Sequence, residues 1–595
     1  MATVIRQLDD EQLERPFNKK LFRRVLRYML PYKKQVFTAL VLMSVATVAA
    51  LANTYLMSRA VGYLQSKEFS TVPFVLLGMV AVSLTAMLCT RQRIRLMDTS
   101  GRRAIAKLRE DLFKHIQGQS FSFFDTRSAG KLLVRVINDV NSLNDLFSNG
   151  IVNVLIECFT LVLLVGIMLA ISWKLTLVAL CILPVLALSV FKLKRMIRVR
   201  WLTNSIKSST MNGYLHETLS GMRVTQAFTR EEVNSKTFRT VNDDVKRSWI
   251  KAVQLSQAFG PTLDLVGSLG TVLVYIFGVK FIRADALALA DMLAILWYVG
   301  RFWEPINAIS DFYNQILTAS ANMERIFEIM DTESEIQDKQ DASELPPIQG
   351  RVTFDDVVFG YNADKTVLNG VSFDIKPGQT VALVGPTGAG KSTVVNLISR
   401  FYDVTGGSVR IDGHDVRDVK LDSLRRQMSV MMQDSFIFSG TIMDNIRYGR
   451  LDATDEEVIR AAKTVYAHDF IMGLEKGYQT VVNERGSMLS QGQRQLISFA
   501  RALLSDPRIL ILDEATSSID THTEMLIQKA IGALLKGRTS FVIAHRLSTI
   551  RNADLIMVVS GGSITEKGTH EELIKLEGGH YRGLCEAQYR FMTAE

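Results

Sequence analysis

Cysteine and proline are scarce in this chain, which has four cysteines and 11 prolines among 595 residues. So few cysteines exclude a framework held by disulfides. The low proline count, together with 30 phenylalanines, excludes a chain that is disordered throughout. A chain of this length exceeds what one hydrophobic core usually supports, so the sequence predicts at least two structural units.

Charged residues are missing from long stretches of the N-terminal half. The segment between Lys34 and Arg59 carries no formal charge, and at about 1.5 Å per residue it is long enough to cross about 30 Å of hydrocarbon. Buried helices of a soluble protein would carry more charges, and a signal peptide would begin nearer the N-terminus. The hydropathy pattern therefore predicts six membrane spans, at 35–58, 69–90, 147–173, 175–191, 252–279 and 286–313.

The charges that are present cluster beside the spans. The net charge is +9, and much of the basic excess lies at 91–103 and 192–200, next to the two long loops, whereas the short loops carry few charges. By the positive-inside rule both termini are cytosolic. This basic surface meets anionic lipid, so we expect no nucleic-acid partner. The basic stretch 17–30 predicts an interfacial helix. We expect the protein to lie in the cell (plasma) membrane, specifically a bacterial inner membrane.

The two long cytosolic stretches, 91–145 and 192–251, have helical patterns with few breakers, so the spans are expected to project beyond the bilayer. Each pattern is interrupted once, at 125–130 and at 219–222. These breaks predict short elements presented to the cytosol, although ordinary loops would also fit the pattern.

The C-terminal half contains a glycine-rich phosphate loop. A polar linker at 331–349 precedes a domain at 350–595, in which the apolar strand 380–384 leads into GPTGAGKST. In such a loop backbone N–H groups converge on phosphate oxygens, while the lysine reaches the β and γ phosphates and the serine hydroxyl holds Mg²⁺. The candidate ATP-binding residues are Gly385, Pro386, Thr387, Gly388, Ala389, Gly390, Lys391, Ser392 and Thr393.

Two further segments suit the same chemistry. The apolar run 509–512 ends in Asp513 and Glu514, which would place one carboxylate to support Mg²⁺ and a second to polarise the attacking water. The segment 489–493 (LSQGQ) precedes a helical run and suits a second anion-binding helix terminus. Taken singly, these segments also fit an ordinary strand end and an ordinary capped helix.

The order of these motifs resembles the nucleotide-binding domain of an ATP-binding cassette protein. Together with six preceding spans, the chain is similar to a half-transporter of the type IV exporter class. The resemblance implies an all-α six-helix transmembrane domain at 35–330, after a cytosolic N-terminus at 1–34, and an α/β P-loop nucleotide-binding domain. The motifs that carry it are Tyr361, 385–393, Gln433, 489–493, Asp513, Glu514, Asp520 and His545.

The resemblance also implies roles for single residues. Tyr361 would stack on adenine, Gln433 would contact Mg²⁺ and the γ-phosphate, Glu514 would be the general base, and His545 would contact the γ-phosphate. A second group would serve the dimer: Asp520 would communicate across it, and the signature residues would complete the partner chain's nucleotide site. These signature residues are Ser490, Gly492 and Gln493, and the segment 484–486 would touch the short cytosolic elements.

One position departs from the family pattern. The signature usually reads Leu-Ser-Gly-Gly-Gln, and here its third residue is Gln491. In heterodimeric exporters with one impaired site, one chain has an intact glutamate after the Walker B strand and an altered signature. This chain, with Glu514 and Gln491, resembles that kind, so we favour a heterodimer over a homodimer.

Two acidic residues lie within predicted spans, Glu157 and Asp264. A carboxylate at mid-bilayer costs on the order of 2.5 to 3.5 kcal/mol on insertion scales, so such residues usually face an aqueous cavity or a partner. They are candidates for recognising cationic amphiphiles. A structural pair or an interfacial location is the alternative.

The expected function is ATP-driven export of a hydrophobic or amphipathic compound across the lipid bilayer, with Mg²⁺ as metal cofactor and a second half-transporter chain as partner. The outward direction rests on the resemblance alone. A lipid flippase of the same fold is the nearest alternative, and an ATP-gated channel or regulatory membrane ATPase is the alternative from another class.

Overall fold

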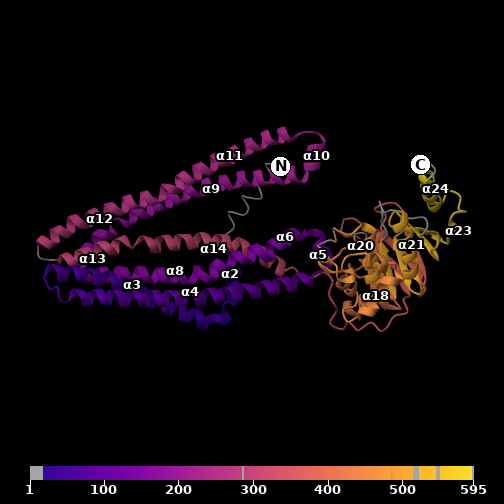
Figure 1. Ribbon diagram of the computed structural model, residues 1–595, viewed down its shortest axis with the longest axis horizontal. Helices are drawn as coiled ribbons and strands as arrows, with labels where there is room; N and C mark the ends of the chain where they lie inside the picture. The colour runs from indigo at the N-terminus through magenta and orange to yellow at the C-terminus, as the bar shows by residue number, and fades with distance from the viewer. Residues whose placement is uncertain are drawn as a thin grey trace. The chain divides into compact units, whose positions relative to one another are not determined.

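The computed structural model describes residues 18–284, 287–362, 364–432, 435–483, 486, 488–513, 521–543 and 550–592. These residues divide into two compact units, drawn in Figure 1. The first unit comprises 18–116 and 130–331, and the second comprises 117–129 and the chain from 332 onward. The second unit therefore takes in a short piece of the N-terminal half.

The first unit is helical. Its apolar sequence favours helices because a helix satisfies its own backbone N–H and C=O groups where no water is present. Its elements are α2 (Lys19–Arg27), η1 (Leu30–Tyr32), α3 (Lys33–Gln65), α4 (Val72–Gln117), α6 (Ala129–Val134), the π-helical turn η2 (Arg135–Asp139), α7 (Val140–Asp145), the π-helical turn η3 (Leu146–Gly150), α8 (Ile151–Leu180), α9 (Leu183–Ser220), α10 (Met222–Ala227), α11 (Glu231–Gln257), α12 (Phe259–Arg283), α13 (Leu289–Gly300) and α14 (Trp303–Met330).

Four helical stretches of the described chain are long and apolar enough to cross a membrane: Leu30–Gln65, Val72–Gln117, Val152–Leu180 and Glu231–Arg283. The fourth and sixth predicted spans are interrupted helices. The fourth breaks at 181–182, just before Pro184, which has no N–H to continue a helix. The sixth breaks between α13 and α14. Extended backbone at Ser172 (φ −159°, ψ 102°) separates the third predicted span from the fourth, beside the short loop expected between these two spans.

A buried tyrosine ties several of these helices together. Tyr298 of α13 is fully buried, and its hydroxyl donates a hydrogen bond to the carbonyl oxygen of Leu51 in α3 at 3.0 Å. Leu164 and Met168 of α8 and Val274 of α12 belong to the same apolar cluster. Helices α9 and α11 run side by side (Figure 1).

The two predicted breaks, in the stretches expected to be cytosolic, are confirmed. The first falls between α5 (Phe121–Thr126) and α6, and the second falls between α9 and α10. The predicted interfacial helix corresponds to α2. Helix α5 clusters with the second unit, whereas α10 clusters with the first.

The second unit contains an antiparallel sheet of order β2-β1-β4-β5, a six-stranded sheet of order β12-β11-β3-β10-β9-β6, and the pair β7-β8. In the six-stranded sheet all neighbours are parallel except β12, which is antiparallel to β11. Besides α5, the second unit has the elements β1 (Val352–Phe359), β2 (Leu368–Ile375), β3 (Thr380–Val384), α15 (Lys391–Ile398), β4 (Gly406–Ile411), β5 (His414–Asp415), α16 (Leu421–Arg425), β6 (Met428–Met431), β7 (Gly440–Thr441), α17 (Ile442–Arg447), α18 (Asp455–Thr464), α19 (His468–Met472), η4 (Gly477–Gln479), β8 (Val481–Val482), α20 (Gln491–Leu504), β9 (Ile509–Asp513), α21 (Thr521–Leu535), β10 (Thr539–Ile543), β11 (Leu555–Ser560), β12 (Ser563–Gly568), α23 (His570–Leu573) and α24 (His580–Met592).

The six-stranded sheet is buried on both faces. Alternate residues of β3 enter two different cores, since Val381 and Leu383 belong to one cluster and Ala382 and Val384 to the other. Burial on both faces explains why its strands read as continuous apolar runs. Because β3 and β9 are both parallel to β10, their carboxyl ends lie at the same edge of the sheet.

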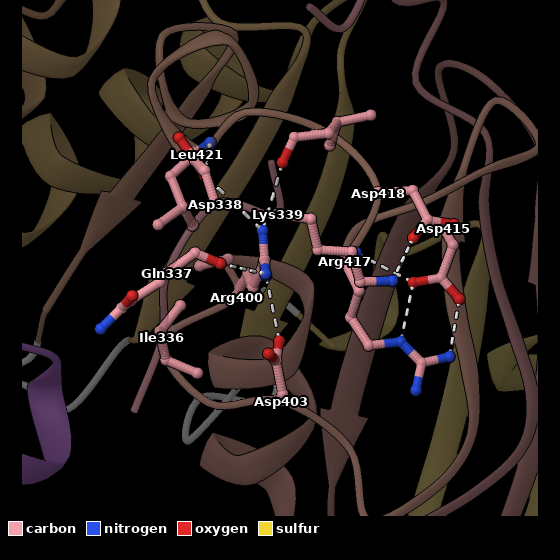
Figure 2. Close-up of polar contacts among 12 residues, drawn as sticks. Ile336, Gln337, Asp338, Lys339, Arg400, Asp403, Asp415, Arg417, Asp418 and Leu421 are labelled. Carbon is pink, nitrogen blue, oxygen red and sulfur yellow. Dashed lines mark hydrogen bonds and ion pairs between the residues drawn. The ribbon is translucent and has the colours of Figure 1, made fainter. Parts of the chain in front are cut away.

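The predicted linker is extended chain held against the second unit. Ser343 forms a parallel bridge with Val419. The backbone N–H of Leu421 donates to Asp338 Oδ1 at 2.9 Å, and the buried Arg400 guanidinium donates to the carbonyl oxygen of Gln337 at 3.2 Å (Figure 2). These contacts fix the segment that leads from the last membrane helix to β1.

Candidate nucleotide site

The phosphate loop lies between the carboxyl end of β3 and the first turn of α15. Gly385 has φ +145°, and a Cβ there would lie 2.1 Å from the carbonyl oxygen of Val559. Gly390 caps α15 at φ +107°, and a Cβ there would lie 2.7 Å from Leu368. Only glycine fits both positions, because L side chains rarely adopt these φ values and have no space there. The close approach of strands β11 and β2 therefore fixes the shape of the loop.

Lys391 is buried and points back into the loop. Its Nζ donates to the carbonyl oxygens of Gly385 at 2.8 Å and Pro386 at 2.9 Å. Burial lowers the pKa of Lys391, and the nearby charge of Asp513 offsets part of that effect. A phosphate bound in the loop would compete with the two carbonyl oxygens for this ammonium group.

The other residues of the phosphate loop divide into exposed and buried ones. Thr387 and Gly388 are exposed at the mouth of the loop, and Ser392 is exposed in the first turn of α15. Ala389 is buried, as is Thr393, whose hydroxyl lies 3.2 Å from the hydroxyl of Tyr361.

Tyr361 stands beside the phosphate loop. Its ring meets the ring of Tyr402 edge-on at 5.0 Å and 88°, and the ring of Phe359 at 5.0 Å and 84°. The side chain of Tyr361 is 46% exposed. Part of the ring is therefore open to a stacking partner, in keeping with the expected adenine contact.

Asp513 is the last residue of β9, as the sequence predicts. Its charge acts on Lys391, so the structure brings the strand-end carboxylate and the loop lysine into one site. Four predicted residues lie outside the described residues: Gln433, Glu514, Asp520 and His545.

The signature segment opens α20. The Ser490 hydroxyl accepts from the backbone N–H of Gln493 at 3.2 Å, and the Gln493 side chain accepts from the backbone N–H of Ser490 at 2.9 Å. This is a reciprocal capping box. Gln491 is exposed and Gly492 is buried at the start of the helix. Of the predicted segment 484–486 only Gly486 is described, and its carbonyl oxygen accepts from Arg494 at 3.3 Å.

The residues present fit ATP and Mg²⁺. A loop in which Gly385 and Gly390 leave no space for a Cβ, a helix N-terminus and a buried ammonium group provide the charge and N–H donors that a triphosphate requires. The exposed Ser392 hydroxyl and the Asp513 carboxylate are oxygen ligands, which Mg²⁺ prefers.

The two membrane acids lie on different helices. Glu157 is half-buried on α8, and Asp264 is exposed on α12. The structure records no hydrogen bond or ion pair between them within the described chain. Glu157 instead lies within electrostatic reach of Glu304 on α14.

Tyr402 is a residue of the site that the sequence did not predict. The Tyr402 hydroxyl donates a hydrogen bond to the Asp125 carboxylate of α5, a residue 277 positions earlier in the chain. No local pattern signals so distant a contact. The one available hint is the pair Phe401 and Tyr402 directly after the helix of the phosphate loop.

Comparison with known proteins agrees with this geometry. Residues 36–305 match the family model of the ABC transporter transmembrane region, and residues 368–517 match the ABC transporter family model. An ABC transporter ATP-binding protein of Bacillus subtilis, YknV, is 44% identical over 98% of this chain and 96% of its own length.

Two further relatives extend the comparison. An ATP-dependent lipid A-core flippase of Syntrophus aciditrophicus is 36% identical over 94% of both chains. A Bacillus subtilis protein named for multidrug export, YgaD, is 36% identical over 94% of this chain and 97% of its own. The chain therefore belongs to the ABC transporter family and is a half-transporter of the exporter type, an ATPase coupled to transport across a membrane.

Proposed function

We propose that this half-transporter exports hydrophobic or amphipathic compounds, using ATP and Mg²⁺ held by the phosphate loop. The observation that carries the proposal is the buried Lys391 inside the glycine loop, beside Asp513, on a chain that also carries apolar helices of membrane-spanning length. An ATP-driven exporter requires a positive charge beside the phosphates of ATP and a membrane-spanning unit, here on the same chain.

The proposed catalytic roles rest on position for the described residues and on the family resemblance for Glu514, Gln433 and His545. The loop N–H groups and Lys391 bind and orient the phosphates, while Ser392 and Asp513 hold Mg²⁺, which supplies charge stabilisation when bound. Glu514 follows Asp513 directly in the chain, where its carboxylate orients and deprotonates the attacking water. Gln433 would contact Mg²⁺ and the γ-phosphate, and His545 would contact the γ-phosphate.

The partner is a second half-transporter chain, and we propose a heterodimer. Ser490, Gly492 and Gln493 complete the partner's nucleotide site, and Asp520 communicates across the dimer. The exposed Gln491 adds a side chain at the first turn of α20, where the family has none, and this weakens the site that the signature completes. A dimer of this chain alone with robust, transport-coupled ATPase activity would refute the heterodimer.

The substrate class rests on the membrane unit. Glu157 and Asp264 offer carboxylates for a cationic amphiphile, and replacing each with its amide tests this role by resistance to cationic dyes. Because one relative is a lipid A-core flippase, lipid is the second candidate substrate. We place the exporter in the plasma membrane, as a bacterial inner membrane, with both termini in the cytosol.

ATPase turnover tests the proposal. The purified chain, together with its partner where one is required, is assayed with cationic dyes and with lipids as stimulants, and Glu514→Gln serves as the blank. Turnover that dyes or lipids stimulate and that Glu514→Gln abolishes supports a pump. Turnover that neither class stimulates favours the regulatory ATPase.

A further inference from the structure

Helix α5 interrupts the membrane half of the chain, yet it packs against the nucleotide domain. The ring of Phe121 stacks on the ring of Phe401 at 5.1 Å and 23°. The hydroxyl of Ser122 donates to Glu335 at 2.6 Å. These two contacts anchor α5 without touching the phosphate loop.

A third contact of α5 does lead to the nucleotide site. Asp125 accepts a hydrogen bond from the Tyr402 hydroxyl. Tyr402 is buried, at 8% exposure, and its ring meets the ring of Tyr361 edge-on at 5.0 Å. Tyr361 in turn lies within hydrogen-bonding distance of Thr393 and Asn396 of α15. The path from the phosphate-loop helix to α5 therefore has two aromatic side chains and one carboxylate.

The Tyr402 hydroxyl is held as a donor. Burial raises the pKa of Tyr402 well above its usual range, and the hydrogen bond to Asp125 raises it further. A protonated phenol bonded to a carboxylate is a charge-assisted hydrogen bond, which is shorter and stronger than a neutral one. An edge-on ring pair has a preferred geometry, so a rotation of Tyr361 disturbs the ring of Tyr402.

We propose that Tyr402 and Asp125 are positioning residues that report to α5 whether a base is stacked on Tyr361. This rests on the proposed function, in which Tyr361 stacks on adenine. The pair transmits a signal from the base, separate from any signal of the phosphates through the glycine loop. Without the hydrogen bond between Tyr402 and Asp125, α5 stays docked through Phe121 and Ser122 but loses its response to the base.

The test compares ATP with tripolyphosphate, which offers phosphates to the loop but has no base. Full-length protein carrying Glu514→Gln, to prevent turnover, is placed in lipid nanodiscs, and amide hydrogen exchange is followed in the peptide that contains α5. We expect ATP to change this exchange severalfold and tripolyphosphate to leave it unchanged. Equal responses to both ligands would overturn the proposal.

Variants separate the path from its anchors. Tyr402→Phe keeps the ring packing and removes the hydrogen bond, so its α5 response to ATP should fall to the tripolyphosphate level while its affinity for ATP changes less than about threefold. Asp125→Ala should behave alike. Ser122→Ala, which removes an anchor on the same helix, should keep the wild-type response. A wild-type response in Tyr402→Phe would refute the path.

A last variant distinguishes failure of this inference from failure of the proposed function. Tyr361→Ala should weaken ATP binding about tenfold, since stacking of a base on an aromatic ring is worth about that factor or more. If ATP binding is unchanged, the adenine contact itself is wrong. If binding weakens as expected but Tyr402→Phe responds normally, the adenine contact stands and the path to α5 does not.

Discussion

Replacing Arg400 with methionine should release the segment that joins the membrane helices to the nucleotide domain. Arg400 is 1% exposed and has φ +48°, an unusual conformation for a side chain of this size. Its guanidinium donates to Asp403 at 3.0 Å and to the carbonyl oxygens of Val419 and Gln337 at 3.2 Å each (Figure 2). Methionine keeps much of the volume but makes none of these bonds.

The expected loss is about 3 kcal/mol. Breaking a buried ion pair by removing one partner costs about 3–5 kcal/mol. The Asp403 side chain is 32% exposed, so water takes over part of the lost interaction and the lower end of the range applies. Since about 1.4 kcal/mol is a factor of ten, local opening of the segment should become about 100-fold more frequent.

Amide hydrogen exchange of the full chain measures this opening. The informative amides are those of Ser343, Leu345 and Ile348, which donate to the Asp418 carbonyl oxygen at 3.2 Å, to Ser423 Oγ at 3.0 Å and to Gln427 Oε1 at 2.8 Å.

The matched control is Arg426→Met. The Arg426 side chain is 76% exposed and pairs with Asp422 on the surface, where an ion pair is worth little. Its exchange should match the wild type. Equal exchange in Arg400→Met and Arg426→Met would refute the role of the buried guanidinium.

Three further predictions concern the nucleotide domain. Gly385→Ala should abolish ATP binding in a nucleotide titration, because its Cβ would meet the carbonyl oxygen of Val559; Gly378→Ala, at φ +77° with open space around the Cβ, should bind normally. Ser490→Ala should speed exchange at the start of α20 about fivefold, since losing a cap costs about 1 kcal/mol; unchanged exchange would mean that the cap is dispensable. Burial raises the pKa of the Cys585 thiol, so its alkylation at pH 8 should be much slower in the folded than in the urea-unfolded chain, and equal rates would contradict its burial.

Local sequence was enough to predict the elements of the phosphate site. Strand β3 and the helix that begins at Lys391 coincide with the expected strand, loop and helix, because glycines and an apolar run fix their conformation within a few residues. Asp513 at the end of β9 was predicted for the same reason. The breaks beside α5 and α10 were also visible as interruptions of helical periodicity.

Contacts between distant parts of the chain could not be predicted. The hydrogen bond between Tyr402 and Asp125 and the docking of 337–343 around Arg400 depend on the tertiary fold, and neither leaves a periodic pattern. The interruption of the sixth span at 301–302 was also missed, since hydropathy averages over a window and does not locate a break of two residues.

ATP-driven accumulation in inside-out vesicles tests the central claim most directly. A fluorescent cationic dye or a labelled lipid is added to the medium outside vesicles that contain this chain, together with its partner where one is required. Vesicles with Glu514→Gln serve as the control. The account predicts uptake against the gradient that requires ATP and Mg²⁺ and is lost in Glu514→Gln. Movement only down the gradient, opened by ATP and retained in Glu514→Gln, would show a gated channel and contradict the account.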